Sequence, residues 1–198
     1  METATVSPTG PTDLKKRRNL VPSSVLGMIM FVMSEIMFFG GLISAFMIVK
    51  AGHIMWPPPD QPRLPVTLTA FNTLFLIASG VLVYLSNKSL ASGDKEGAKK
   101  QLGIAILLAF VFVGVQGYEW VRMLGHGLTM TSSTYGSFFF MIIGCHALHV
   151  CGAVAALIII FLKFSKPDFK ASSFWGVQVF WYFVVGVWPI LYYLVYLS

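Results

Sequence analysis

The stretch Met33–Gly41 (MSEIMFFGG) places a carboxylate, Glu35, inside the first long apolar run of a 198-residue chain. Two phenylalanines and two glycines follow this carboxylate closely. An ionisable group is costly to insert into hydrocarbon, so it marks a candidate functional site whose partner must be sought elsewhere in the chain. The stretch therefore predicts a membrane-spanning helix with a polar site inside it.

The composition favours a membrane protein. Hydrophobic residues make up 56% of the chain and charged residues only 11%, whereas soluble domains carry about 25% charged residues. The formal net charge is +6, but the basic residues form short clusters between apolar runs. This pattern is typical of topology signals, so we expect no nucleic-acid partner.

The apolar runs predict an all-α fold, a bundle of five transmembrane helices. We expect spans at about residues 22–49, 65–85, 102–121, 135–162 and 174–197, each long enough to cross about 30 Å of hydrocarbon. Residues 1–21 are expected to form a cytoplasmic tail, and residues 22–198 the membrane domain. Pro189 is expected to kink or loosen the last span.

The basic residues predict an orientation with the N-terminus inside and the C-terminus outside. In that orientation the outer side holds three of the 14 basic residues, Lys50, Arg63 and Arg122. The cytoplasmic segments hold the other eleven, which are Lys15, Lys16, Arg17, Arg18, Lys88, Lys95, Lys99, Lys100, Lys163, Lys166 and Lys170. Such a bias in short loops sets the orientation of membrane proteins.

Glu35 and His149 are expected at the same depth. Glu35 lies about 20 Å along its helix from Pro22, and His149 about 21 Å before Lys163 on a helix of opposite direction. His146 lies nearly on the same face as His149, one turn away. Either the two side chains face each other or a shared polar ligand such as a lipid headgroup or water, or each is satisfied separately within the bundle.

Gln116, Glu119 and Arg122 form a second polar group near the outer end of their span. A Glu119–Arg122 pair at the interface is the favoured interpretation, and Gln116 is expected to make an interhelical hydrogen bond. The small residues after Glu35, including Gly40 and Gly41, predict close packing against a helix of this chain or another.

We expect no metal site and no catalytic residue in this chain. His146 and His149 are suitably spaced for a shared metal ion, but only Glu35 would join them, and metal sites normally need three or four protein ligands. The spans also lack a series of titratable groups that reaches both surfaces, and no internal repeat is visible. A stand-alone transporter or channel is therefore the less favoured alternative.

Six motifs resemble, in order, those of subunit III of the heme-copper terminal oxidases, which oxidise cytochrome c or quinol. The similarity covers about residue 25 to the end and corresponds to the five-span bacterial form. The motifs are Ser34–Gly40 (SEIMFFG), Trp56–Pro58 (WPP), Asn72–Thr73 with Ala78–Gly80 (NT, ASG), Gln116–Glu119 (QGYE), Tyr135–Phe139 (YGSFF) and Gly144–Val150 (GCHALHV).

The resemblance implies an accessory subunit of a proton-pumping oxidase in aerobic respiration, located in the bacterial cytoplasmic membrane. Its partners would be the catalytic subunit I, which holds the hemes and copper, other oxidase subunits and structural phospholipid. In this family the acid matching Glu35 lies near bound phospholipid, and the histidine matching His149 lies in the same region. Glu35, His149 and His146 are therefore expected to bind lipid or to tune proton uptake.

The last span departs from the family pattern. The family usually has Trp-His-Phe-Val-Asp where this chain has Trp181–Val185 (WYFVV). Tyr182 and Val185 thus replace two ionisable residues, and no role of those residues transfers to this chain. This difference leaves a related accessory subunit of nitric oxide reductase as an alternative.

Overall fold

The computed structural model describes residues 23–56, 66–164, 169 and 171–197. Within these ranges the chain is helical and no strand occurs. All five long helices have the length and apolar composition needed to cross a membrane, which confirms the predicted all-α, five-span fold. The predicted tail, residues 1–21, lies outside the described residues. The elements are α1 (Ser23–Ala51), α2 (Val66–Ala91), α3 (Lys95–Gly125), α4 (Thr134–Lys163), α5 (Ala171–Tyr192) and the π-helix η1 (Tyr193–Leu197).

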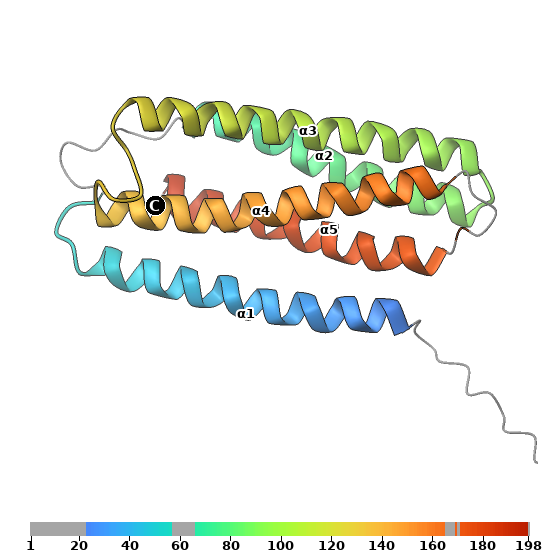
Figure 1. Ribbon diagram of the computed structural model, residues 1–198, viewed down its shortest axis with the longest axis horizontal. Helices are drawn as coiled ribbons and strands as arrows, with labels where there is room; N and C mark the ends of the chain where they lie inside the picture. Colours follow the sequence, from blue (N-terminus) through green and yellow to red (C-terminus); the bar gives the residue numbers. More distant parts are fainter. Residues whose placement is uncertain (1–22, 57–65, 165–168, 170, 198) are drawn as a thin grey trace, which may run out of the picture.

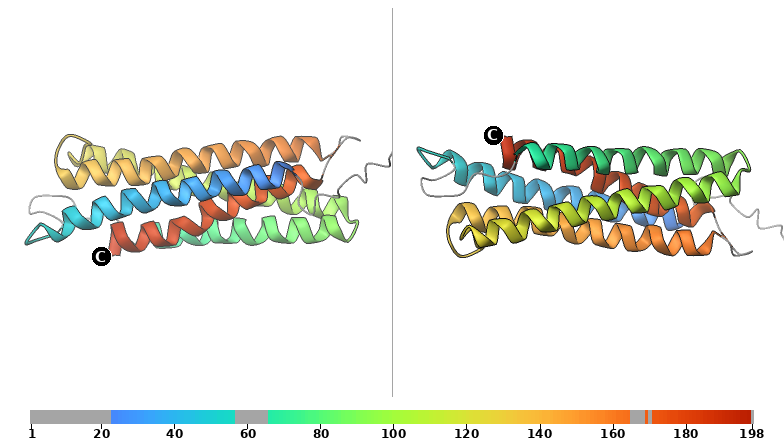
Figure 2. Two further views of the ribbon diagram at one scale, coloured as in Figure 1. Left: turned by 90° about the horizontal axis from the view of Figure 1, so that it is seen from below. Right: turned by 90° about the horizontal axis from the view of Figure 1, so that it is seen from above.

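The helices form an elongated bundle in which successive helices run in opposite directions (Figures 1 and 2). The α2–α3 hairpin has the most extensive contact, and α5 packs against α1, α2 and α4. In contrast, α1 lies at the edge of the bundle, packs mainly on α5 and has few contacts with α4. The protein thus has a tightly packed part, α2 to α5, and a loosely attached helix, α1.

The α2 and α3 helices extend into the segment 86–101, which separates the two expected spans, and leave only a short turn between them. The α2 helix continues to Ala91 and α3 already begins at Lys95. Gly93 adopts a φ of 87°, which favours glycine, and the Asp94 side chain accepts a 2.8 Å hydrogen bond from the Gly97 N–H. The helices are longer than the expected spans because polar helix ends can continue beyond the hydrocarbon, where hydropathy no longer marks the helix.

The turn between α3 and α4 brings backbone segments into close contact. The Ser133 hydroxyl caps α4 by accepting a hydrogen bond from the Gly136 N–H at 3.0 Å. A side chain at position 136 would collide with the Thr129 carbonyl oxygen. Glycine is therefore required in this first turn of α4.

The core lies mainly between α2, α3, α4 and α5, and Phe39 and Phe46 of α1 are buried against it. Its largest fully buried side chains are two tryptophans of α5, Trp181 and Trp188. The α5 helix contains Pro189, which cannot donate a backbone hydrogen bond, and the winding widens into η1 four residues later. The change to a π-helix agrees with the predicted loosening of this span.

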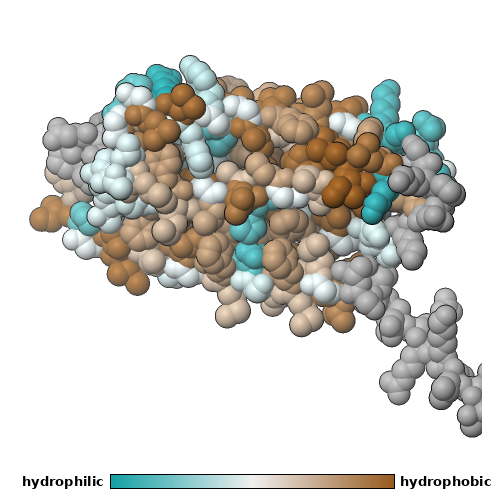
Figure 3. Space-filling view, in the orientation of Figure 1, coloured by the Kyte–Doolittle hydropathy of each residue, from teal (hydrophilic) through white to brown (hydrophobic). Residues whose placement is uncertain are grey.

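The molecular surface follows the pattern of a membrane protein. Brown, hydrophobic side chains dominate the face drawn in Figure 3, hydrophilic residues gather at both ends, and a small hydrophilic patch interrupts the middle. The end of α2, the start of α3 and the end of α4, with Lys88, Lys95 and Lys163, lie at the same end of the bundle as the start of α1 (Figure 1). Lys88, Lys95 and Lys163 are thus gathered at one end, whereas Lys50 and Arg122 lie in the last turns of α1 and α3 at the other end. The orientation across the membrane stays a prediction.

Candidate functional site

Glu35 of α1 and His149 of α4 are in direct contact. The distance between Glu35 Oε2 and His149 Nε2 is 2.9 Å, and the side chains are 17% and 14% exposed, respectively. The hydroxyl of the neighbouring Ser34 donates to the Phe31 carbonyl oxygen of its own helix. Of the arrangements left open by the sequence, the structure contains the direct pair.

The hydrogen bonds of His149 define how protons are distributed in the pair. His149 Nδ1 lies 2.7 Å from the Cys145 carbonyl oxygen, which can only accept, so Nδ1 carries a proton. The contact with Glu35 holds one further proton, either on the carboxyl or on Nε2. In both states the pair has no net charge, which lowers the cost of holding it in hydrocarbon.

Aromatic rings surround this pair. Phe39 is buried and its ring centroid lies 5.2 Å from that of His149, with the two rings edge to face. Phe38 stacks on the same imidazole at 6.5 Å, and Phe180 of α5 lies at 6.3 Å. These rings leave the imidazole few orientations, so the hydrogen bond to Glu35 is well defined.

His146 occupies a different environment from His149. Its side chain is 1% exposed and stacks on Trp188 of α5, with the ring centroids 4.9 Å apart. Its Nε2 has no hydrogen-bond partner. The structure therefore does not bring His146 to the Glu35 carboxylate, although Phe39 contacts both histidines.

Glu119 is the centre of a second polar cluster, inside the bundle. The Thr69 hydroxyl of α2 lies 2.9 Å from both carboxylate oxygens of Glu119, which is 1% exposed. The Gln116 Nε2 donates to Glu119 Oε2 at 3.1 Å and to the Tyr196 hydroxyl of η1 at 3.1 Å. This cluster links α2, α3 and η1, and it contains the interhelical hydrogen bond expected of Gln116.

The expected interfacial pair between Glu119 and Arg122 was wrong. Arg122 is exposed, whereas Glu119 is buried and bound by Thr69 and Gln116. The carboxylate turns inward because α2 offers a buried hydroxyl at its level. The Arg122 guanidinium turns outward because the Glu119 carboxylate already has hydrogen-bond partners, and burying a charge beside it would cost solvation free energy.

The contribution of α2 to the buried cluster was not predicted from the sequence. Five polar residues of this helix are buried, and their successive spacings of three, one, six and seven positions place them on one helix face. The Asn72 amide donates to the Phe112 carbonyl oxygen at 3.0 Å, and the Ser86 hydroxyl donates to the Ala98 carbonyl oxygen at 2.8 Å. This spacing was the signal in the sequence that could have predicted a buried polar face of α2. The face consists of Thr69, Asn72, Thr73, Ser79 and Ser86.

The glycines after Glu35 face open space. A Cβ atom at Gly40 or Gly41 would meet nothing within 4 Å among its neighbours. At Gly80 of α2, in contrast, it would lie 3.3 Å from Val185 Cγ1 of α5. The predicted close packing around Gly40 is thus not made by another described helix of this chain.

The two unusual positions of α5 are accommodated by local contacts. Val185 packs against Gly80, so an apolar contact fills the position where the related family usually has an acid. Tyr182 is partly exposed, and its hydroxyl accepts a hydrogen bond from Gln178 Nε2. Neither residue contacts the Glu35–His149 pair through a hydrogen bond in the described structure.

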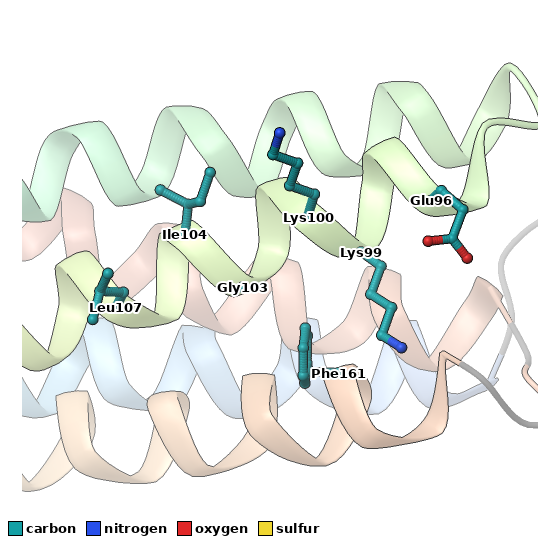
Figure 4. Close-up of a pocket in the computed structure, with 7 residues that line it drawn as sticks. All are labelled: Glu96, Lys99, Lys100, Gly103, Ile104, Leu107 and Phe161. Atoms are coloured by element: carbon teal, nitrogen blue, oxygen red, sulfur yellow. The ribbon is translucent and has the colours of Figure 1, made fainter.

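No group of three or more His, Cys, Asp or Glu side chains suited to holding a metal ion occurs in the described ranges of the chain. A hollow of about 400 Å³ lies between the first turns of α3 and the last turns of α4 (Figure 4). Lys99 Nζ reaches to 5.6 Å from the Phe161 ring centroid, whereas Lys100 points away from α4. About 18 Å of helix separates Phe161 from His149, so this hollow is distinct from the pair.

Comparisons with known proteins agree on one family. The family model described as cytochrome c oxidase subunit III matches residues 17–198. The cytochrome c oxidase subunit 3 of Thermostichus vulcanus is 30% identical over 177 residues, which cover 87% of this chain and 86% of the relative. The protein of the same name from Corynebacterium diphtheriae is 33% identical over 169 residues, covering 82% of each chain. A probable cytochrome c oxidase subunit 3 of Mycobacterium leprae is 33% identical over 175 residues, covering 86% of each.

Proposed function

Because this chain belongs to the cytochrome c oxidase subunit III family, we propose that it serves as the accessory subunit III of a bacterial heme-copper oxidase. It is a multi-pass membrane protein, and we place it in the cytoplasmic membrane beside subunit I and the other oxidase subunits. The hemes and copper reside in those partners. The nitric oxide reductase alternative is not favoured, because the relatives reported above are named as cytochrome c oxidase subunits.

The observation that supports a specific role is the partly exposed hydrogen bond between Glu35 and His149, 2.9 Å long. The pair ties α1, which has few other contacts with α4, to the rest of the bundle. The pair lies far from the polar ends of its helices, so its surroundings are hydrocarbon or a neighbouring subunit. A hydrogen-bonded pair without net charge tolerates such surroundings, whereas either partner alone would be left unsatisfied.

The pair therefore holds α1 in place and supports a phospholipid bound beside it. The exposed outer residues of α1 are mostly apolar, including Met30, Met37 and Ile48, and they suit contact with acyl chains. With α1 and its lipid in place, the accessory subunit sustains the structure around subunit I and its proton uptake during turnover. This chain itself transfers no electrons.

Purification through a tag on this chain tests the assignment. From native membranes we expect the chain to co-purify with a subunit that carries heme and copper and with cytochrome c or quinol oxidase activity. Mass spectrometry would identify the partners and the lipids in the same sample. Recovery of the chain alone, or with a complex that reduces nitric oxide and lacks copper, would overturn the assignment.

The N-in, C-out orientation remains part of the proposal. It is supported by the basic residues gathered at the end of the bundle where α1 begins. Alkaline phosphatase, which is active only outside the cytoplasm, is expected to be active when fused after Ser198 and inactive when fused in the α2–α3 turn. The reverse pattern would contradict the orientation.

A further inference from the structure

The hollow between α3 and α4 follows a partly exposed stripe of α3 at the end of the bundle where α1 begins (Figure 4). Six of its seven lining residues belong to the first turns of α3, and the seventh is Phe161 of α4. Gly103 lies in the middle of the stripe, where an added Cβ atom would come within 3.3 Å of Phe161 Cε2. The hollow of about 400 Å³ is therefore open because no side chain fills the middle of this stripe.

Lysine side chains stand on both sides of Gly103 in this hollow. Figure 4 shows Lys99 on the side of α4, where its Nζ lies 5.6 Å from the Phe161 ring centroid, and Lys100 on the opposite side. Glu96 is the acidic residue among the described residues that line the hollow, and it lies about one turn nearer the start of α3. The two lysines are thus the charged residues nearest to the apolar part of the hollow. Two ammonium groups in this arrangement suit an anion held between them.

The hollow becomes apolar toward the middle of the membrane. Ile104 and Leu107 continue it, and both side chains are exposed. Leu107 lies about 12 Å further along the helix axis than Lys99. This order of cations first and aliphatic side chains deeper matches a phospholipid, whose phosphate lies in the headgroup region and whose acyl chains enter the hydrocarbon. A free phosphate ion would gain nothing from the apolar part.

We propose that this hollow binds an anionic phospholipid, with the phosphate between the ammonium groups of Lys99 and Lys100 and an acyl chain along Ile104 and Leu107. Lysines at the end of a membrane helix also serve simply to reach the polar surface. The specific claim is that these two hold one lipid, whereas other lysines at the same end do not. The site is separate from the lipid proposed beside α1, because the hollow lies far from the Glu35–His149 pair.

Electron cryomicroscopy of the whole complex, purified through a tag on this chain and placed in nanodiscs that contain phosphatidylglycerol, tests the proposal. We expect headgroup density between Lys99 and Lys100 that continues as a chain past Ile104 and Leu107. Compact density without a chain would identify a free ion and overturn the proposal, as would a neighbouring subunit in the hollow or no density at all. The test requires no particular partner, so its failure would leave the assignment of the chain to an oxidase intact.

Two matched double variants separate a specific site from general attraction to the membrane. Lys99→Gln with Lys100→Gln removes both cations of the hollow. Lys95→Gln with Lys163→Gln removes two charges from exposed residues that lie at the same end of the bundle but do not line the hollow. After a detergent wash, mass spectrometry should find about one phosphatidylglycerol fewer per complex in the first variant and no loss in the second. Equal retention in the two variants would overturn the proposal.

The charge of the lipid headgroup supplies a further measurement. Phosphatidylglycerol and the zwitterionic phosphatidylcholine, with identical acyl chains, are offered to the delipidated complex. We expect the wild type to retain phosphatidylglycerol in the hollow roughly fivefold better or more, because two cations face the phosphate. Lys99→Arg with Lys100→Arg keeps both charges and should keep this preference, whereas the double glutamine variant should lose it. Equal retention of the two lipids by the wild type would contradict an anionic lipid site.

Discussion

The two polar clusters of this protein differ in how completely its own helices enclose them. Glu119 is only 1% exposed, and hydrogen bonds from α2 and α3 satisfy its carboxylate. The Glu35–His149 pair lies at the edge, where α1 has few contacts with α4, and each partner remains partly exposed. One carboxylate is bound entirely by this chain, and the other keeps a side open to its surroundings.

This difference separates a structural role from a functional one. The enclosed carboxylate holds helices together, because its removal deprives buried hydrogen-bond donors of this acceptor and water cannot reach them. The open carboxylate holds one loosely packed helix and still faces lipid or a neighbouring subunit. We therefore expect substitutions at the Glu119 cluster to affect stability, and substitutions at Glu35 to affect the lipid bound beside α1.

The largest effect on stability is expected for Glu119→Ala. The substitution removes the buried carboxylate to which the Thr69 hydroxyl and the Gln116 amide donate, so the folded state should lose about 3 kcal/mol. Thermal dissociation of the subunit from the complex measures the change. Glu96→Ala is the matched control, because Glu96 is exposed on the same helix. Equal dissociation temperatures for the two variants would refute the structural role.

A smaller effect is expected when the Glu35–His149 pair is broken. Glu35→Ala or His149→Ala alone should each destabilise the attachment of α1 by about 1 kcal/mol, because the remaining partner is part-exposed. The double variant should lose less than the sum, with a coupling of about 1 kcal/mol. Dissociation temperatures of the four proteins give this cycle. Strictly additive shifts would mean that the two side chains do not interact.

The smallest effects concern two glycines, and they test the packing difference directly. Gly80→Ala pushes a methyl group against Val185 and should cost about 1 kcal/mol. Gly40→Ala meets open space and improves helix propensity, so its dissociation temperature should be unchanged or slightly higher. A larger loss at Gly40 than at Gly80 would mean that a neighbouring subunit packs closely on α1, which would reverse the comparison.

Much of the fold was predictable because hydrocarbon imposes strong rules on sequence. Long apolar runs have to be helices in a membrane, and the five runs became five helices. The helix ends were less predictable. The turn around Gly93 and Asp94 lies in polar sequence, where capping residues rather than hydropathy decide where a helix stops.

The depth of the candidate site residues along their helices was predictable, but the direction in which their side chains point was not. Counting residues along two helices placed Glu35 and His149 at one level, and their side chains are in contact. The same counting could not show that Glu119 turns toward Thr69, because the rotation of a helix about its axis depends on packing. Three residues along a helix differ by about 60° in direction, enough to turn His146 toward Trp188 and away from Glu35.

The central claim is that the open Glu35–His149 pair supports lipid and sustained turnover rather than electron transfer. The most direct measurement compares purified oxidase carrying Glu35→Ala with oxidase carrying Ser34→Ala, its exposed neighbour bonded within α1. We predict that only Glu35→Ala lowers the phospholipid retained per complex and shortens activity during continuous turnover, while a single turnover of electron transfer is preserved. Unchanged lipid content together with loss of single-turnover electron transfer, in a fully assembled complex, would contradict the account.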